Sequence, residues 1–172
     1  MENPEQARAV AEAMVALWRG EMPATVRVLS AVPDEGRDFT PHEKSRTAWQ
    51  LVTHIATSDL WFIRSITEGR FAFDPAAAKA AEAKFSTVAD VVAFYESTVP
   101  AALEGILDLS DEALAQQVDF FGMVSRSRAR WVGAAALHGI HHRGQLSSYL
   151  RSMGAKVPDI YGPSADADRI PV

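Results

Sequence analysis

The chain has 172 residues, contains no cysteine and carries a formal charge of −5. This length suits one domain with a full hydrophobic core, and 48% hydrophobic with 23% charged residues is the composition of a soluble globular protein. The acidic balance disfavours nonspecific binding to nucleic acid or to an anionic membrane, which both need clustered lysine and arginine. Without cysteine, disulfides, protein thiolates and cysteine-ligated zinc are excluded, so a metal would need imidazole, carboxylate or water ligands.

The N-terminal segment from Met1 to Ala13 carries several charged residues and lacks the apolar core of a signal peptide. No window of the sequence is long and apolar enough to span a bilayer. We therefore expect a cytoplasmic protein in which residues 1–172 form a single domain.

Helical periodicity dominates the chain and alternating strand patterns are nearly absent, so the sequence predicts an all-α protein built from four long helices. Gly20 and Pro23 predict a kink or a break in the first helix, and Pro100 predicts a kink in the third. The predicted helical segments are, in chain order, Pro4–Leu29, Ser45 or Arg46 to Thr67, a segment capped by Ser86 and continuing through Ile106, a short turn at Asp111–Gln116 opened by Ser110, and Ser127–Met153.

The connections between these helices indicate where the helices end and which of them run in the same direction. Gly69 is expected to end the second helix, and Gly154 stands where a left-handed residue would end the last one. The stretch from Gly69 to Phe85 is long enough to cross the bundle and join two helices that point the same way. The tail from Lys156 to Val172 has little periodicity and is expected to be a docked or partly mobile extension.

Two histidines lie four residues apart on the last predicted helix. At about 100° per residue, His138 and His142 share one face, and both imidazoles can reach one metal ion. His54 lies midway along the second helix beside Leu51 and Ile55, where it is either a third ligand or a core histidine satisfied by hydrogen bonds. Together the three predict a divalent-metal site with an open coordination position, the arrangement of a catalytic metal.

Other polar residues are predicted beside this site. The helix face that carries the histidine pair also carries Gln145 and Tyr149, which are candidate catalytic residues together with Arg143. Arg143 or Arg151 could hold a substrate carboxylate, and either could instead be a surface residue. His141 is an alternative ligand, a base behind the ligands or a rim residue.

His42, the remaining histidine, is expected in an exposed loop. Three imidazoles suit several first-row metals, so the cofactor is expected to be Zn2+ or Ni2+, with Fe2+ and Mn2+ as further candidates. Aromatic residues such as Trp18, Phe62 and Phe94 could exceed what one core can bury, which favours a homodimer.

Two segments resemble the hallmark segments of the DinB-like superfamily, which includes damage-inducible DinB proteins and thiol-dependent S-transferases and isomerases. They are the stretch from Trp49 to Ala56 and the stretch from Leu137 to Leu146, followed by Tyr149, Leu150, Arg151 and Gly154. The loop from Pro41 to Ser45 is similar to one found in a branch of that superfamily. The resemblance implies an up-down-down-up four-helix bundle with a long crossover connection, a divalent metal on His54, His138 and His142, and frequent homodimers.

The resemblance does not select a reaction, because fold and metal ligands do not determine a substrate. An open metal site can lower the pKa of a bound thiol or water. The first hypothesis is therefore a metal-dependent transferase that uses a low-molecular-weight thiol and an electrophile. The alternatives are a non-catalytic, stress-related metal-binding dimer and a metal-dependent hydrolase.

Overall fold

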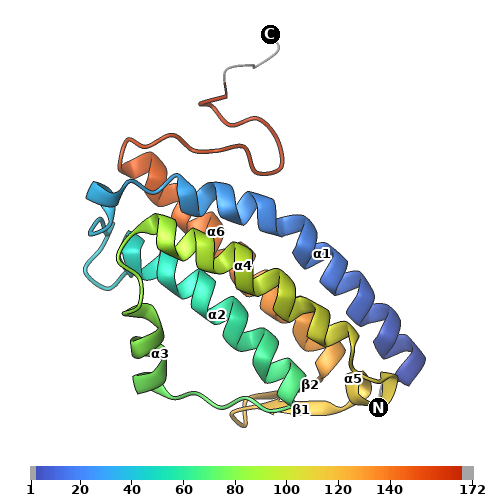
Figure 1. The fold of residues 1–172 in the computed structure, drawn as a ribbon. Helices are drawn as coiled ribbons and strands as arrows, with labels where there is room; N and C mark the ends of the chain where they lie inside the picture. The colour runs from blue at the N-terminus through green and yellow to red at the C-terminus, as the bar shows by residue number, and fades with distance from the viewer. Residues whose placement is uncertain (1–2, 168–172) are drawn as a thin grey trace.

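The computed structural model describes residues 3–167, and it confirms the expected four-helix bundle (Figure 1). The four long helices are α1 (Pro4–Ser30), α2 (Ala48–Glu68), α4 (Val88–Leu107) and α6 (Arg128–Ser152). The smaller elements are η1 (Asp34–Gly36), α3 (Pro75–Glu82), α5 (Asp111–Ala115) and a hairpin of β1 (Gln117–Phe120) and β2 (Val124–Ser127). Within the described residues, no helix has the length and apolar character needed to cross a membrane.

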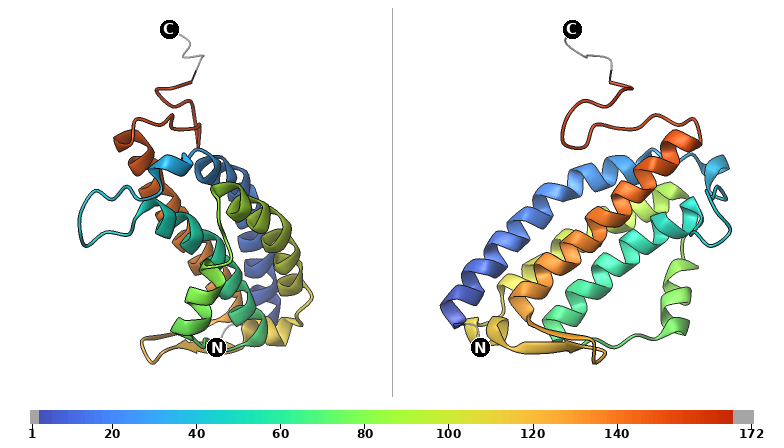
Figure 2. Two further views of the ribbon diagram at one scale, coloured as in Figure 1. Left: turned by 60° about the vertical axis from the view of Figure 1, so that its left-hand side comes forward. Right: turned by 180° about the vertical axis from the view of Figure 1, so that it is seen from behind.

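The helices follow the up-down-down-up order. Helices α1 and α6 run in one direction while α2 and α4 run in the other (Figures 1 and 2). The connection between α2 and α4, which contains α3, returns along the length of the bundle, so the predicted crossover is confirmed. Each long helix packs on two others, in the circular order α1, α6, α2, α4, and this order places α2 and α6 side by side.

Capping residues explain where three of the helices begin. Thr47 accepts a hydrogen bond from the Gln50 amide at 3.1 Å, and the Gln50 side chain accepts one from the Thr47 amide, which completes a capping box at the start of α2. The equivalent cap of α4 is Thr87, one residue after the predicted Ser86, because Asp90 stands at the third position of a second capping box. Ser127 caps α6.

The predicted helix ends are confirmed at two glycines, and the predicted break is wrong. Gly69 (φ 75°) ends α2 and Gly154 (φ 74°) follows α6, both in the left-handed region. Helix α1 runs without interruption through Pro23. Buried Trp18 and Val28 lie on either side of that proline, and packing of both halves on one core outweighs the local loss of a hydrogen bond.

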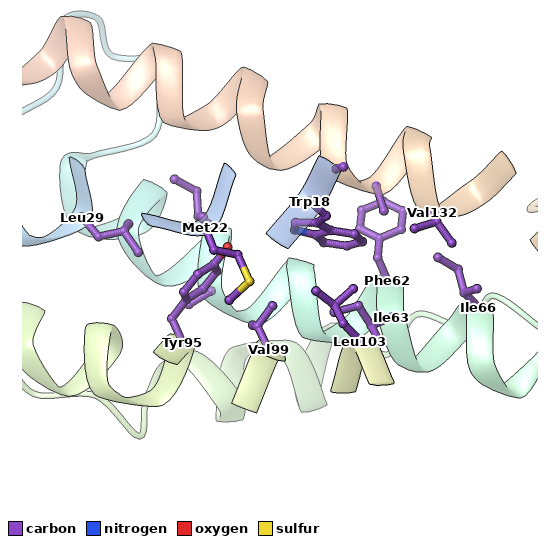
Figure 3. Close-up of a cluster of buried hydrophobic side chains, with 14 of the residues drawn as sticks. Trp18, Met22, Leu29, Phe62, Ile63, Ile66, Tyr95, Val99, Leu103 and Val132 are labelled. Atoms are coloured by element: carbon purple, nitrogen blue, oxygen red, sulfur yellow. The ribbon is translucent and has the colours of Figure 1, made fainter. Parts of the chain in front are cut away.

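The core lies between all four long helices. Figure 3 shows Trp18 of α1, Phe62 and Ile63 of α2, and Val99 and Leu103 of α4 within one buried cluster. Trp18 and Phe62 are 2% and 8% exposed, so a single chain already hides two of the three aromatic residues on which the homodimer expectation rested, while Phe94 is partly buried.

The hairpin was not predicted, whereas a docked tail was one of the two expectations for the segment that begins at Lys156. The indole nitrogen of Trp131 donates a hydrogen bond to the Val118 carbonyl at 2.9 Å and ties β1 to α6. The described part of the tail is docked, because Arg27 of α1 donates to the Asp159 carbonyl at 3.1 Å and Arg151 of α6 pairs with Asp166 at 2.7 Å. The tail beyond residue 167 lies outside the described residues.

Candidate metal centre

Three histidines meet where α2 and α6 lie side by side. One ring nitrogen from each of His54, His138 and His142 lies within 4.8 Å of those of the other two. Their ring centroids are separated by 4.5–5.2 Å, and each ring meets its neighbours edge to face. The three side chains are only partly buried, so a small molecule can reach them from solvent.

A glycine on α6 allows the two helices to approach closely enough for this meeting. Gly139 follows His138 and packs against the carboxylate of Asp59 on α2, so that a Cβ at this position would lie 3.0 Å from Oδ1 and 3.2 Å from Oδ2. Asp59 is completely buried and its Oδ2 accepts a hydrogen bond from the Tyr95 hydroxyl of α4 at 3.1 Å. The core on one side of α2 thus sets the distance at which His138 faces His54.

The three imidazoles are neutral at physiological pH. Burial lowers the pKa of His54 to about 3 and that of His138 to about 4, with further contributions from the charge of Arg46 and from the neighbouring histidines. Burial also lowers the pKa of His142. Neutral imidazole is the form that binds a metal ion, so protons do not compete for these nitrogens near pH 7.

Two nitrogen environments fit a bound divalent ion. The Nδ1 of His142 lies 3.1 Å from the Gln145 Oε1, and its proton donates to that oxygen, which leaves Nε2 with a free lone pair. The Nδ1 of His138 is buried and has no hydrogen-bond partner among the described residues. Three neutral imidazoles on one side of an ion form the donor set expected for a first-row transition metal.

Tyr149 and Arg46 lie at the end of the site that is farther from the hairpin. Tyr149 lies on α6 seven residues after His142, and its hydroxyl donates to the Arg46 carbonyl at 3.2 Å. Its ring packs edge to face on Phe39 with centroids 5.6 Å apart. Tyr149 therefore positions the loop that precedes α2, and among the described residues it makes no hydrogen bond or ring contact with the histidines.

Arg46 was missed by the sequence analysis, which treated it only as a helix start. Its side chain is exposed, its charge lowers the pKa of all three site histidines, and no described carboxylate pairs with it. No local pattern distinguishes such an arginine, because only the packing of Tyr149 against the loop brings it to the site.

The other sequence candidates lie away from the three histidines. Arg143 is buried on the opposite side of α6, where it pairs with Glu21 of α1 at 2.7 Å and donates to the Tyr161 hydroxyl at 2.6 Å. Arg151 pairs with Asp166 of the tail. Both arginines therefore hold α1 and the tail in place, and we do not include them in the site.

The two remaining histidines also lie outside the ligand group. His141 is exposed, and its ring centroid lies 4.9 Å from that of His142. His42 lies in the exposed loop as predicted, where its Nδ1 accepts a hydrogen bond from the Lys44 amide at 3.1 Å.

The chain matches the DinB family model over residues 1–169. It belongs to the DinB family. Two curated relatives come from Bacillus subtilis: YjoA is 35% identical over 119 residues, which span 67% of this chain and 73% of the relative, and YrdA is 27% identical over 155 residues, which span 87% and 86%. Neither name states an activity.

Solved DinB-like structures share the fold. A DinB-like protein from Bacillus subtilis superposes with a TM-score of 0.66 at 24% identity, covering 88% of this chain and 99% of the other. One from Bacillus cereus gives a TM-score of 0.70 at 22% identity, covering 87% and 97%. The family match and the histidine group together describe a DinB-family protein with a three-histidine cluster that could hold a divalent metal ion.

Proposed function

We propose that this DinB-family protein is a metal-dependent transferase that joins a small-molecule thiol to an electrophile. The observation that carries the proposal is the group of His54, His138 and His142, which are neutral, partly exposed and close enough to share one ion. Three protein ligands leave a coordination position for a small molecule, whereas structural zinc sites are usually closed by four. Zn2+ and Ni2+ are the first candidates, and Fe2+ and Mn2+ have compatible ligand chemistry.

The surroundings favour a thiol over water as the nucleophile. The group within 4.8 Å contains no carboxylate that could act as a general base, and Asp59, the acid nearest along α2, faces the core and is bonded by Tyr95. A thiol ionises at a pKa of about 8.5, far below that of water at about 15.7, so it needs less assistance. A bound divalent ion would supply positive charge that favours the thiolate.

Arg46 strengthens the preference for an anionic nucleophile. Its guanidinium adds a positive charge beside three neutral ligands, and no described carboxylate neutralises it. It can also donate hydrogen bonds to a carboxylate, which many small-molecule thiols carry. Arg46 therefore takes the role that the sequence analysis considered for Arg143 and Arg151.

The reaction balances without a redox partner. The sulfur must come from outside the chain, since the protein has no cysteine. With a chlorinated aromatic electrophile, a carbon–sulfur bond forms and the carbon–chlorine bond breaks. Chloride leaves with the electron pair, and the thiol proton passes to solvent.

The test is a conjugation assay with a panel of bacterial low-molecular-weight thiols and 1-chloro-2,4-dinitrobenzene. We expect turnover that needs both metal and thiol, that chelator abolishes and that His142→Ala abolishes, while His42→Ala retains it. Metal binding without conjugation above the uncatalysed rate would defeat the transferase and favour the non-catalytic metal-binding protein. Metal-dependent ester or amide hydrolysis without any thiol would favour the hydrolase.

A further inference from the structure

Seven aromatic side chains gather where the hairpin meets α2 and α6, and we call them the aromatic cluster. Their neighbouring ring centroids lie 4.8–6.5 Å apart, mostly edge to face. They come from α2, the connection that follows it, the hairpin and α6: Trp61, Phe62, Phe71, Phe73, Phe120, Phe121 and Trp131. Figures 1 and 2 show the hairpin and the connection from α2 to α3 at the same end of the bundle.

The aromatic cluster adjoins the histidines directly. The ring centroid of Phe62 lies 5.1 Å from that of His138. Trp61 follows His54 by seven residues and Trp131 precedes His138 by seven. Because α2 and α6 run in opposite directions, both tryptophans lie on the ligand faces about 10 Å toward the hairpin.

The cluster presents apolar surface and few polar groups. The indole nitrogen of Trp61 donates to the Ala72 carbonyl and that of Trp131 to the Val118 carbonyl, each at 2.9 Å, so both polar atoms are already used. Its rim remains in solvent: Phe73 is 58% exposed and Phe121 is 49% exposed. Exposed aromatic surface beside a candidate metal centre is typical of a binding surface, whereas the aromatic side chains of a hydrophobic core are buried.

The backbone at Phe121 is held in an unfavourable conformation. Its φ of 53° lies in the left-handed region, where a bulky side chain is unfavourable and asparagine or glycine is preferred. Gly122 (φ 75°) follows it in the hairpin loop. The Phe121 ring contacts Phe120 at 4.9 Å and remains half exposed. The stability of the hairpin does not explain a phenylalanine at this position.

We infer that the aromatic cluster is the apolar subsite of the histidine centre and binds a flat aromatic group of the electrophile, with Phe121 as its outer wall. This inference rests on the proposed transferase function. An aromatic electrophile is electron-poor, and electron-rich indole and phenyl rings attract such a ring in offset or edge-to-face contact. Arg46 lies just before the start of α2, on the other side of the histidines from the aromatic cluster, so the thiol is held near Arg46 and the electrophile at the cluster.

The test measures binding separately from turnover. The probe is 2,4-dinitrotoluene, which keeps the electron-poor ring of the electrophile and has no leaving group. Its binding to metal-loaded protein is followed by quenching of tryptophan fluorescence, since Trp61 and Trp131 lie in the cluster, and by titration calorimetry. The variant is Phe121→Asn, and the control is Met123→Gln, which removes an exposed apolar side chain from the same hairpin.

We expect saturable binding to the native protein, weaker by about three- to ten-fold in Phe121→Asn, the equivalent of one aromatic pair, and unchanged in Met123→Gln. The melting temperature of Phe121→Asn should equal or exceed that of the native protein, because asparagine tolerates the positive φ. A lower melting temperature would assign Phe121 a structural role and overturn the inference. Unchanged binding, or no saturable binding to the native protein, would also overturn it.

Two further results separate this inference from the proposed function. Saturable dinitrotoluene binding without any conjugation would retain the subsite and defeat the transferase. Conjugation of a compact aliphatic electrophile such as iodoacetamide, without dinitrotoluene binding, would retain the transferase and defeat the subsite. Loss of self-association in Phe121→Asn, measured by sedimentation, with unchanged dinitrotoluene binding would identify the cluster as a protein interface and overturn the inference.

Discussion

Gly139 packs directly against the buried carboxylate of Asp59, with only 3.0 Å between Oδ1 and the position that a Cβ would occupy. Because the carboxylate is enclosed, neither side can move away easily. We expect Gly139→Ala to lower the free energy of unfolding by about 1–3 kcal/mol, as overpacked cores do. The variant should also bind metal more weakly, because α6 must shift and carries His138 with it. Denaturant unfolding and metal titration measure the two effects.

The matched control is a second glycine of the same helix. Gly144 is exposed, and a Cβ there would meet nothing within 4 Å. Gly144→Ala should therefore raise the free energy of unfolding by about 0.5–1 kcal/mol through helix propensity. It should leave metal affinity unchanged. If both variants changed stability in the same direction, the Asp59 contact would not be the cause.

Asp59 predicts a pH dependence of stability. Burial raises its folded-state pKa from 3.8 to about 7, although the hydrogen bond from Tyr95 acts in the opposite direction. Between these two values the folded state holds a proton that the unfolded state has lost. The contribution of Asp59 to stability is therefore fully present below about pH 4 and is lost as the pH rises through 7.

Asp59→Asn removes this titration while keeping the shape of the side chain. At each pH we compare the free energy of unfolding of the variant with that of the native protein. The difference should favour the variant more at about pH 8 than at about pH 5, by on the order of a few kcal/mol, because one pKa unit corresponds to about 1.4 kcal/mol. The measurement is denaturant unfolding of metal-free protein at the two pH values. The site histidines contribute equally to both proteins and cancel. If the variant and the native protein differed in free energy of unfolding by the same amount at both pH values, the raised pKa of Asp59 would be contradicted.

Metal binding should depend on each of the three grouped histidines. We predict about one divalent ion per chain, lost in His54→Ala, His138→Ala and His142→Ala, because two imidazoles hold an ion much less tightly than three. His42→Ala and His141→Ala should retain the ion, since both side chains lie outside the group. Elemental analysis of untagged protein measures this. Similar loss in all five variants would show that the ligand set is wrong.

Much of the fold was accessible from the sequence because local signals agree with the packing. Gly69 and Gly154 end helices through left-handed conformations that glycine adopts readily, and Ser127 supplies the hydroxyl that begins α6. The histidine pair was accessible because a spacing of four residues places two side chains on one helix face. No spacing rule joins residues on different helices, so His54 was connected to that pair by the expectation that two helices of one bundle turn these faces inward, together with resemblance to a known family.

The remaining features depend on contacts between distant segments. The hairpin has short strands, and Phe121 occupies a turn position where asparagine or glycine would have signalled it. Arg143 resembled a site residue because it follows His142 in the sequence. Successive residues of a helix point about 100° apart, so the Arg143 side chain lies on another side of α6, where it pairs with Glu21. Gly20 and Pro23 predicted a kink or a break, and packing on the core keeps α1 unbroken through both residues.

We also expect a homodimer, formed through the outer face of α1 and α6. Leu17 is 43% exposed and Leu137 is 64% exposed, and Leu137 lines a groove of about 1150 Å³ together with Val10 and Met14 of α1. Leu137→Glu should shift the protein to monomer at micromolar concentration in sedimentation. Met123→Glu, at an equally exposed position of the hairpin, should not. A native protein that sediments as a monomer would contradict the expectation.

Arg46 gives a prediction in which metal and thiol respond in opposite directions. Its positive charge disfavours imidazolium, so Arg46→Gln should raise the pKa values of His54 and His138 in metal-free protein. NMR titration of the ring protons measures this shift. Removing a charge that repels a divalent ion should leave metal affinity near pH 7 equal or higher, because these pKa values remain below that pH.

Binding of the anionic thiol should weaken in Arg46→Gln, in contrast to binding of the metal ion. In Arg46→Gln the KM for the thiol should rise, and the pH at which turnover reaches half its maximum should move upward, because one positive charge no longer favours the thiolate. Arg46→Lys keeps the positive charge and should therefore retain the native pH profile. A thiol that carries a carboxylate should still bind more weakly to Arg46→Lys than to the native protein, because lysine cannot form the paired hydrogen bonds of a guanidinium. A parallel loss of metal and thiol affinity in Arg46→Gln would mean that the loop before α2 had lost its position. In that case Tyr149→Phe, which removes the hydroxyl that anchors the Arg46 carbonyl, should reproduce the same loss.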